Sequence, residues 1–171
     1  MTRLMTRSPR QPSSTETERP APHTPITDVL ADIRELFGAA HASVWDATDQ
    51  TSPPTVVDFV SSDSAEPELD SRGTGLIAWA ANQRIGEIST DGERVAFAAT
   101  PLPSPPGTRQ VLAVGANESG ALKLPREQLR TWLPRLARRL ATLRARLDPH
   151  ASASQSERNA DLLLLTATQL Q

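Results

Sequence analysis

Histidine and carboxylate side chains are the groups in this sequence that could act as general acids or bases or hold a metal ion. His41 follows the first apolar segment, whereas His23 and His150 lie in polar stretches, so no two histidines are spaced to bind one metal. Haem ligation by His41 alone is the alternative to an ordinary surface histidine. The carboxylates that stand on separate predicted elements, with no partner base, are Asp58, Glu87 and Asp91. We therefore predict no catalytic residue, no metal site and no enzyme activity within this chain.

Cysteine chemistry and phosphate-binding loops are also excluded. The sequence contains no cysteine, which rules out disulfides, thiolate metal sites, a cysteine nucleophile and a cofactor attached through a thioether. Gly73 and Gly75 begin the stretch GTGL, which lacks the later glycine of a dinucleotide fingerprint and the lysine of a P-loop. We interpret this stretch as a turn and the start of a helix.

Large apolar side chains offer the remaining type of site, a pocket for a small molecule. The chain has only six aromatic residues, and four of them fall on segments that the predicted fold turns toward a sheet and its covering helix. With one neighbouring leucine, they are our candidate ligand-binding residues: Trp45, Phe59, Leu76, Trp79 and Phe97. The identity of any cofactor is unknown. The alternative is that these residues form hydrophobic core, because a domain so poor in aromatics needs its few large side chains for packing.

Two helices that would position these residues follow from capping signals and apolar periodicity. Thr24 is a predicted N-cap, followed by proline in the first helical position, and the apolar residues then repeat at helical spacing until Gly38 ends the helix. A short helix is predicted over residues 73–83, with Thr74 as its cap.

The remaining segments predict five strands and a long terminal helix. β-prone runs occur at residues 42–46, 55–61, 84–89, 94–102 and 110–116. The helix is predicted over residues 125–147, with a kink at Pro134. Its leucines alternate in steps of three and four: Leu129, Leu133, Leu136, Leu140, Leu143 and Leu147. Such a seam is typical of a helix that packs on another helix, so we predict a homodimer through it. The alternative is that the seam packs on the chain's own sheet.

Charge is distributed unevenly along a chain whose formal net charge is −2. Residues 123–148 contain eight Lys or Arg side chains and two acids, a net charge of +6, so the rest of the chain sums to −8. We expect this basic helix to face an acidic surface of its own fold or of a second copy rather than nucleic acid, because no recognised DNA-binding pattern accompanies it. No apolar run reaches the roughly 20 residues that span a bilayer, and the N-terminus has no signal-peptide core. We therefore predict a cytoplasmic protein without a membrane span.

Four stretches, taken in order, carry a resemblance to a known family: ITDVLADIRELFGAAHASVWDAT, GTGLIAWAANQR, AATPLP, and RQVLAVGA followed by REQLRTWLPRLARRLATL. Together they span residues 26–147 and resemble the GAF family of sensor domains. The resemblance implies an α+β fold of the GAF/PAS type, an α/β/α sandwich with a central antiparallel sheet of about five strands and flanking helices. It also implies a ligand pocket between the sheet and the short helices, as in many members, and dimerisation through the terminal helices. This chain departs from the bilin-binding members, because it lacks their tethering cysteine, and it has no clear cyclic-nucleotide signature.

The resulting organisation has four parts. We expect a disordered tail over residues 1–23, a GAF-like domain over 24–147, a linker over 148–156, and over 157–171 the start of a signalling or coiled-coil helix. This last helix either leads into an output domain or completes a parallel bundle with a second copy. The resemblance implies a regulatory sensor module in bacterial signal transduction, which binds a small molecule or dimerises to control an output domain, and an enzyme beyond Gln171 would be one such output. The alternative function is a ligand-free dimerisation or adaptor module.

Overall fold

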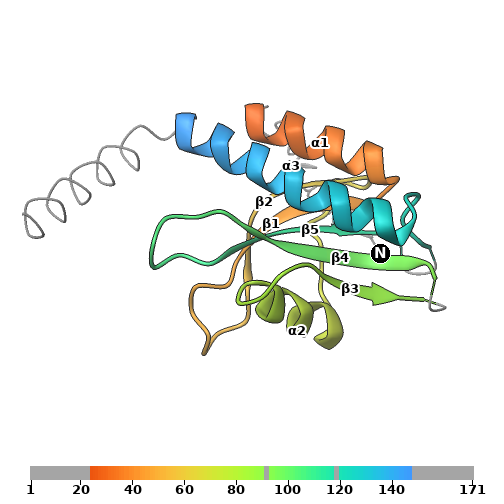
Figure 1. The fold of residues 1–171 in the computed structure, drawn as a ribbon, viewed down its shortest axis with the longest axis horizontal. Helices are drawn as coiled ribbons and strands as arrows, with labels where there is room; N and C mark the ends of the chain where they lie inside the picture. Colours follow the sequence, from red (N-terminus) through yellow and green to blue (C-terminus); the bar gives the residue numbers. More distant parts are fainter. Residues whose placement is uncertain (1–23, 91–92, 118–119, 148–171) are drawn as a thin grey trace, which may run out of the picture.

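Eight elements form the described part of the structure, a computed structural model that covers residues 24–90, 93–117 and 120–147 (Figure 1). In chain order they are α1 (Pro25–Phe37), β1 (His41–Asp46), β2 (Thr55–Ser61), α2 (Ser71–Ala80), β3 (Gly86–Ser89), β4 (Val95–Leu102), β5 (Gln110–Gly115) and α3 (Arg126–Leu147). The predicted tail over 1–23, the linker over 148–156 and the helix start over 157–171 lie outside the described residues. Within the described ranges, no helix combines the length and the apolar character needed to cross a membrane.

Local sequence signals set both ends of α1. The side-chain oxygen of Thr24 accepts a hydrogen bond from the backbone N–H of Thr27 at 3.3 Å, and the Thr27 hydroxyl oxygen accepts one from the backbone N–H of Thr24 at 2.9 Å. This reciprocal capping box satisfies two backbone donors that a helix start otherwise leaves unpaired. Gly38 follows the helix with φ of 58°, a left-handed conformation that glycine adopts without strain. The predicted ends of this helix are confirmed.

The five strands form one antiparallel sheet in the order β2-β1-β5-β4-β3. β1 therefore lies between β2 and β5, and the pairing of β5 with β4 and of β4 with β3 completes the sheet. A register shift at Val44 and Trp45 marks an irregularity where β1 meets β2. This arrangement confirms the predicted α+β fold with a five-stranded antiparallel sheet.

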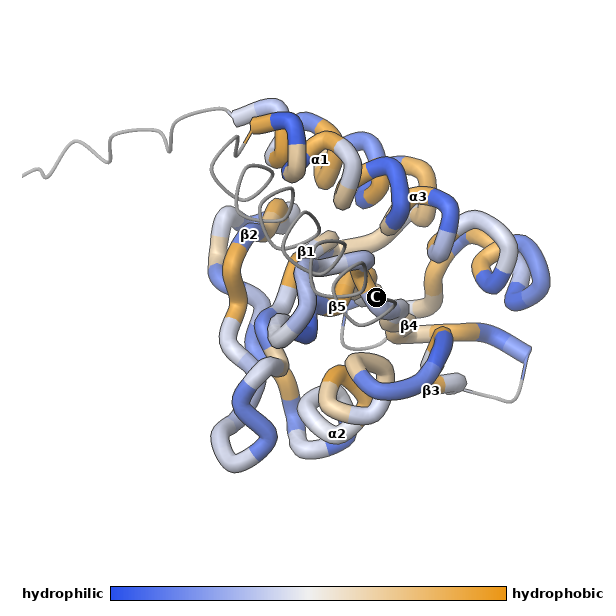
Figure 2. The backbone as a smooth tube through the Cα atoms, turned by 60° about the vertical axis from the view of Figure 1, so that its left-hand side comes forward, coloured by the Kyte–Doolittle hydropathy of each residue, from blue (hydrophilic) through white to orange (hydrophobic). Residues whose placement is uncertain are grey.

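Helices cover both faces of the sheet (Figure 1). α1 and α3 lie side by side on one face, and α2 packs on the other face against β3, β4 and β5. The core accordingly divides into a larger cluster beneath α1 and α3, which includes Phe37 and Leu112, and a smaller cluster beneath α2, which includes Trp45 and Ile77. Figure 2 shows hydrophobic and hydrophilic residues alternating along α1 and α3, as expected for helices with one buried face.

The leucine seam of α3 packs mainly on the chain's own core. Three of its leucines have no exposed surface and belong to the larger core cluster: Leu129, Leu133 and Leu140. Leu136 and Leu143 are half-buried, and Leu147 is 48% exposed. The prediction that the whole seam meets a partner helix therefore needs correction, because its best-buried leucines have no surface left for a second copy. A helix that covers a sheet also buries positions three and four apart, so the spacing did not separate the two outcomes.

Arginines on the inner flank of α3 bind carboxylates of the sheet. Arg126 and Arg130 both pair with Glu87 of β3, the second at 2.8 Å between Nη2 and Oε1. Arg144, near the other end of the helix, pairs with Asp58 of β2 at 3.2 Å. Because β3 and β2 are the two edge strands, these ion pairs hold α3 across the full width of the sheet.

The helix on the opposite face, α2, begins earlier than predicted. Asp70 is its N-cap in place of Thr74, and the Asp70 carboxylate accepts a hydrogen bond from the backbone N–H of Gly73 at 2.7 Å. Thr74 lies inside the helix and donates its hydroxyl to the Asp70 carbonyl at 2.9 Å. Both side chains are good caps, and the earlier one begins the helix. The helix ends at Ala80, before residue 83, and β3 begins at Gly86 rather than at residue 84.

Candidate functional site

The sheet face beneath α2 carries the candidate site. Four neighbouring strands each contribute one small residue to a row across this face, which we call the small-residue row: Ser43, Ala113, Ala99 and Gly86. Larger side chains border the row on both sides. His41 and Phe97 lie on one side, with Gly115 between them in the sheet, and Trp45 lies on the other. Side chains alternate along a strand, so residues two apart in each strand share this face.

A chain of polar contacts runs along β1. The Trp45 indole Nε1 donates a hydrogen bond to Ser43 Oγ at 2.8 Å, and Ser43 Oγ lies 3.5 Å from His41 Nδ1. Ser43 has no exposed surface, and Trp45 is only 5% exposed. A buried hydroxyl or indole N–H without a partner costs free energy, so this pairing stabilises both side chains in the interior.

His41 lies over Gly115 and beside Phe97. The His41 and Phe97 ring centroids are 6.0 Å apart. A Cβ atom on Gly115 would stand 2.8 Å from His41 Cε1 and 3.0 Å from Phe97 Cδ2, so only glycine leaves room for both rings. Burial lowers the pKa of His41 from its ordinary value of 6.5, and the negative charge of Asp63 partly opposes that shift. The imidazole is therefore neutral at pH 7 and keeps a ring nitrogen that can accept a hydrogen bond.

Two side chains of α2 lie over the β3 end of the small-residue row. A Cβ atom on Gly86 would stand 2.6 Å from Leu76 Cδ1 and 3.1 Å from Trp79 Cε3. Trp79 is nevertheless 48% exposed, whereas Ile77 and Ala80 have no exposed surface. The expectation that Trp79 faces the sheet is therefore only partly met, because Trp79 touches the sheet with one edge and otherwise faces solvent. The buried face of α2 is centred on Ile77, on the side of the helix that packs on β3, β4 and β5.

The structure brings all five predicted ligand-binding residues to this side of the sheet: Trp45, Phe59, Leu76, Trp79 and Phe97. Their burial differs, because Trp45 and Phe97 belong to the smaller core cluster, and Phe59 and Leu76 are half-buried. Sequence reasoning did not assign Ser43 or Gly115 to the site, and it treated His41 only as a lone histidine. Strand alternation was the available signal for two of them, because residues 41, 43 and 45 share a face when the segment is extended.

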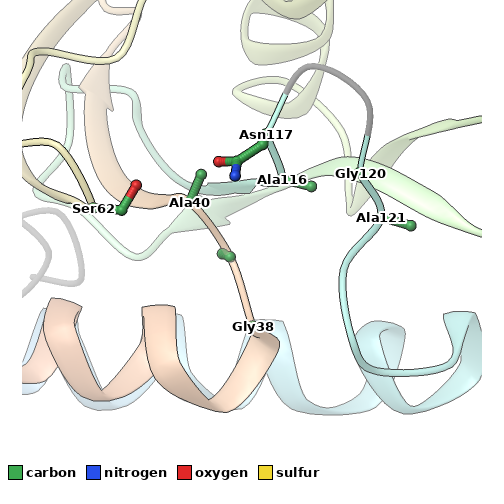
Figure 3. A pocket seen from close by; sticks show the side chains of 8 residues that line it. Gly38, Ala40, Ser62, Ala116, Asn117, Gly120 and Ala121 are labelled. Carbon is green, nitrogen blue, oxygen red and sulfur yellow. The ribbon is translucent and has the colours of Figure 1, made fainter.

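A separate pocket of about 190 Å³ lies where α1 ends and β1 begins (Figure 3). Its lining consists of Gly38, Ala39, Ala40, Ser62, Ala116, Asn117, Gly120 and Ala121. Figure 3 shows that Ser62 and Asn117 supply its polar side chains. None of the predicted ligand-binding residues lines it. Glycine and alanine make up the rest of the lining, which leaves few side-chain groups to recognise a ligand.

Polar groups that the sequence offered for catalysis are engaged within the fold, as far as the structure describes them. Ser43 and His41 are spaced like a nucleophile and its base, but the Ser43 hydroxyl oxygen already accepts a hydrogen bond from the Trp45 indole. Glu87 and Asp58 are held in ion pairs with α3, and Asp91 lies outside the described residues. Among the residues that the structure describes, no group of three or more His, Cys, Asp or Glu side chains is placed to hold a metal ion.

No protein-family model and no curated protein matches this sequence. Among solved structures, the fold is similar to that of the GAF3 domain from a Synechocystis sp. protein in its photoproduct state, with a TM-score of 0.50 and 14% identity over 77% of this chain and 94% of that chain. A far-red cyanobacteriochrome photoreceptor has a TM-score of 0.47 and 12% identity, over 72% of this chain and 85% of that chain. The cyanobacteriochrome receptor PixJ has a TM-score of 0.47 and 17% identity, over 71% of this chain and 93% of that chain. The first likeness shows that the fold is GAF-like.

Proposed function

We propose that the chain is a regulatory module of the GAF type that binds a small molecule against the small-residue row. That row carries the proposal, because Ser43, Ala113, Ala99 and Gly86 form a strip of small residues between larger side chains. Ile77 and Ala80 of α2 belong to the cluster that covers this strip in the structure. A flat molecule lying on the strip would displace no strand side chain. The similar Synechocystis domain is described in a photoproduct state, and a regulatory role for this chain accords with that.

Side chains of α2 provide the entrance to the row in this proposal. Leu76 and Trp79 lie over Gly86 at the β3 end. Because Trp79 is half exposed already, moving it into solvent removes less apolar surface from the interior than moving a core residue such as Ile77 would. Rotation of Trp79 away from Gly86 would therefore open the β3 end of the strip at a modest cost in free energy.

The bordering residues define the chemistry of the ligand. Trp45 and Phe97 offer apolar surfaces on the two sides of the row, and His41 offers a neutral ring nitrogen for one hydrogen bond. The site accordingly suits a flat, mainly apolar molecule with a single donor or acceptor that reaches His41.

Thermal unfolding with a panel of compounds tests the proposal. The panel contains haem, biliverdin, cyclic nucleotides and 2-oxo acids, and a ligand should raise the unfolding temperature in a saturable manner. Trp79→Ala should alter the affinity by opening the β3 end of the row. Trp132→Ala is the matched control, because Trp132 is equally exposed, at 46%, but lies on α3. A flat response of both the wild type and the Trp79→Ala variant to every compound would contradict the proposal.

A ligand-free adaptor module is the second candidate function. It is favoured by the burial of Trp45 and Phe97, which are 5% and 9% exposed and pack with Ile77 in the smaller core cluster. In that case the α2 side of the sheet is complete without a ligand, and regulation passes through protein contacts. Dimerisation through α3 belongs to this candidate, and it would use the part of the seam that retains exposed surface: Leu136, Leu143 and Leu147. Light scattering on wild type and on Leu143→Glu/Leu147→Glu tests it, because a seam dimer should dissociate in the variant.

A further inference from the structure

The outward face of α3 combines exposed arginines with an exposed tryptophan. Steps of three, four and seven residues place five side chains on one side of the helix, which we call the basic face: Trp132, Arg135, Arg138, Arg139 and Arg146. All five are exposed. The Arg135 guanidinium carbon lies 5.7 Å from the centroid of the Trp132 ring, a distance at which cation and ring attract each other.

The arginines of α3 fall into two sets. Arg126, Arg130 and Arg144 pair with carboxylates of the sheet. The four arginines of the basic face form no ion pair with any residue that the structure describes. Like charges on one helix face repel one another, so an opposing acidic surface would lower the free energy of this face.

The loop between β2 and α2 carries the complementary charge. Residues 62–70, which we call the acidic loop, contain no Lys or Arg and four exposed acids: Asp63, Glu66, Glu68 and Asp70. Asp63 and Asp70 accept hydrogen bonds from backbone N–H groups of their own turns. Glu66 and Glu68 form no ion pair within the described ranges, which leaves both carboxylates available to an outside partner.

The basic face and the acidic loop are separate surfaces. The loop starts at Ser62, whose backbone N–H donates to the Ala40 carbonyl at 2.8 Å, and it crosses to the α2 side of the sheet. The acidic loop ends at Asp70, the N-cap of α2, and α2 lies across the sheet from α3 (Figure 1). No ion pair joins the two surfaces among the described residues. Each copy therefore presents one surface of each sign, and the two signs can meet when a second copy approaches.

We propose that two copies of this chain associate head to tail, with the basic face of one against the acidic loop of the other. Charge favours a second copy over nucleic acid as the partner. The chain outside residues 123–148 has a net charge of −8, which would repel a polyanion. In a second copy, the same negative charge would attract the basic face of α3. Trp132 adds apolar area within the contact. The two surfaces are unlike, so the contact is heterologous and can repeat. This association is independent of ligand binding beneath α2.

Sedimentation of the full chain over a range of protein and salt concentrations tests the association. The wild-type mass should rise with protein concentration at low salt and fall as salt is added. Arg138→Glu/Arg139→Glu and Glu66→Arg/Glu68→Arg should each weaken self-association by about tenfold or more, because each turns attraction into repulsion. An equimolar mixture of the two variants should associate again, because each supplies the surface that the other has lost. Arg84→Glu, an exposed charge outside both surfaces, should behave as wild type.

Three results would overturn the proposal: a wild type that stays monomeric at low salt, self-association that neither double variant weakens, or a mixture that fails to associate while circular dichroism shows both variants folded. A monomeric wild type that is retained on immobilised duplex DNA, with retention lost in Arg138→Glu/Arg139→Glu, would assign the basic face to nucleic acid and would likewise overturn it.

Discussion

The imidazole of His41 occupies the space above Gly115, its cross-strand partner in β5. At this point on the α2 side of the sheet, β1 provides the imidazole ring, and β5 has a glycine that leaves space for it. Phe97 of β4 closes the same space from the other side, since a Cβ atom on Gly115 would stand 3.0 Å from its ring. The packing of the His41 and Phe97 rings therefore requires glycine at position 115, and substitutions can test this requirement.

Gly115→Ala should destabilise the fold by about 1 to 3 kcal/mol, because the added methyl group forces the His41 or Phe97 ring to move in a packed interior. Urea unfolding measures the change. His41→Ala combined with Gly115→Ala should recover part of the loss relative to the sum of the two single variants, since the new methyl then enters vacated space.

Gly75→Ala is the matched control for that substitution. Gly75 lies inside α2, and apart from its chain neighbours and the backbone of its own helix no heavy atom stands within 4 Å of an added Cβ. Alanine is the better helix former, so this change should stabilise the protein by up to about 1 kcal/mol. Equal effects of the two glycine substitutions would show that the His41 contact has no energetic importance.

Acid should destabilise the fold through His41. Burial holds the pKa of the folded imidazole below 6.5. As the pH falls through about 6.5, His41 is therefore protonated in the unfolded chain but still neutral in the folded protein. The free energy of unfolding therefore decreases from that pH downward, and the loss is complete below the folded pKa. Unfolding temperatures measured from about pH 8 to pH 5 report the effect.

His41→Gln isolates this dependence, because it removes the buried imidazole and leaves His23 and His150 in place. The difference in unfolding temperature between pH 8 and pH 6 should shrink in this variant. Asp63→Asn should enlarge it, because the Asp63 charge favours the protonated ring. An unchanged pH profile in both variants would be inconsistent with the assignment to His41.

Leu140→Ala and Leu147→Ala separate core packing from dimer contact along α3. Leu140 is fully buried, so its truncation should cost about 2 to 5 kcal/mol, whereas Leu147 is half exposed and its truncation should cost less than about 1 kcal/mol. Urea unfolding gives both values, and light scattering follows the mass. A Leu140→Ala protein with unchanged stability, whose mass in solution falls from that of a dimer to that of a monomer, would show that the seam is a dimer interface after all.

Glu87→Gln should loosen the N-terminal half of α3. The Glu87 side chain is 8% exposed and pairs with Arg126 and Arg130. The two arginines are well exposed and can be solvated when the charge is removed, so the expected loss is about 1 kcal/mol in the free energy of unfolding. Glu66→Gln, which changes an exposed loop residue, should have no measurable effect. Hydrogen exchange in α3 would show whether the loss is local.

Elements defined by neighbours in the chain could be predicted without the structure. The ends of α1 follow from Thr24 and Gly38, whose effects act over three or four residues. The strands follow from short β-prone runs between turn signals, and the helical phase of the leucines continues through Pro134 within α3. These signals were sufficient for the helices and the five strands, whereas the resemblance to the GAF family implied the α+β class and the antiparallel sheet.

Part of the candidate site was accessible in the same way. The aromatic candidates do reach the α2 side of the sheet, and alternation along β1 would have added His41 and Ser43 to Trp45. Gly115 was not accessible, because its role depends on β5 pairing with β1 in a register that places it opposite His41. Strand partners distant in the sequence are chosen by packing of the whole sheet, and no local pattern encodes that choice.

The sequence by itself determined which side chains share a face of each helix and strand, because the periods of 3.6 and 2 residues are properties of the backbone. Only the tertiary structure decided what each face meets. The seam of α3 met its own sheet at Leu129, Leu133 and Leu140, and Trp79 of α2 was left half in solvent. A periodic apolar pattern indicates that one face of an element is buried. Because the hydrophobic effect is non-directional, the pattern does not determine which surface packs on that face.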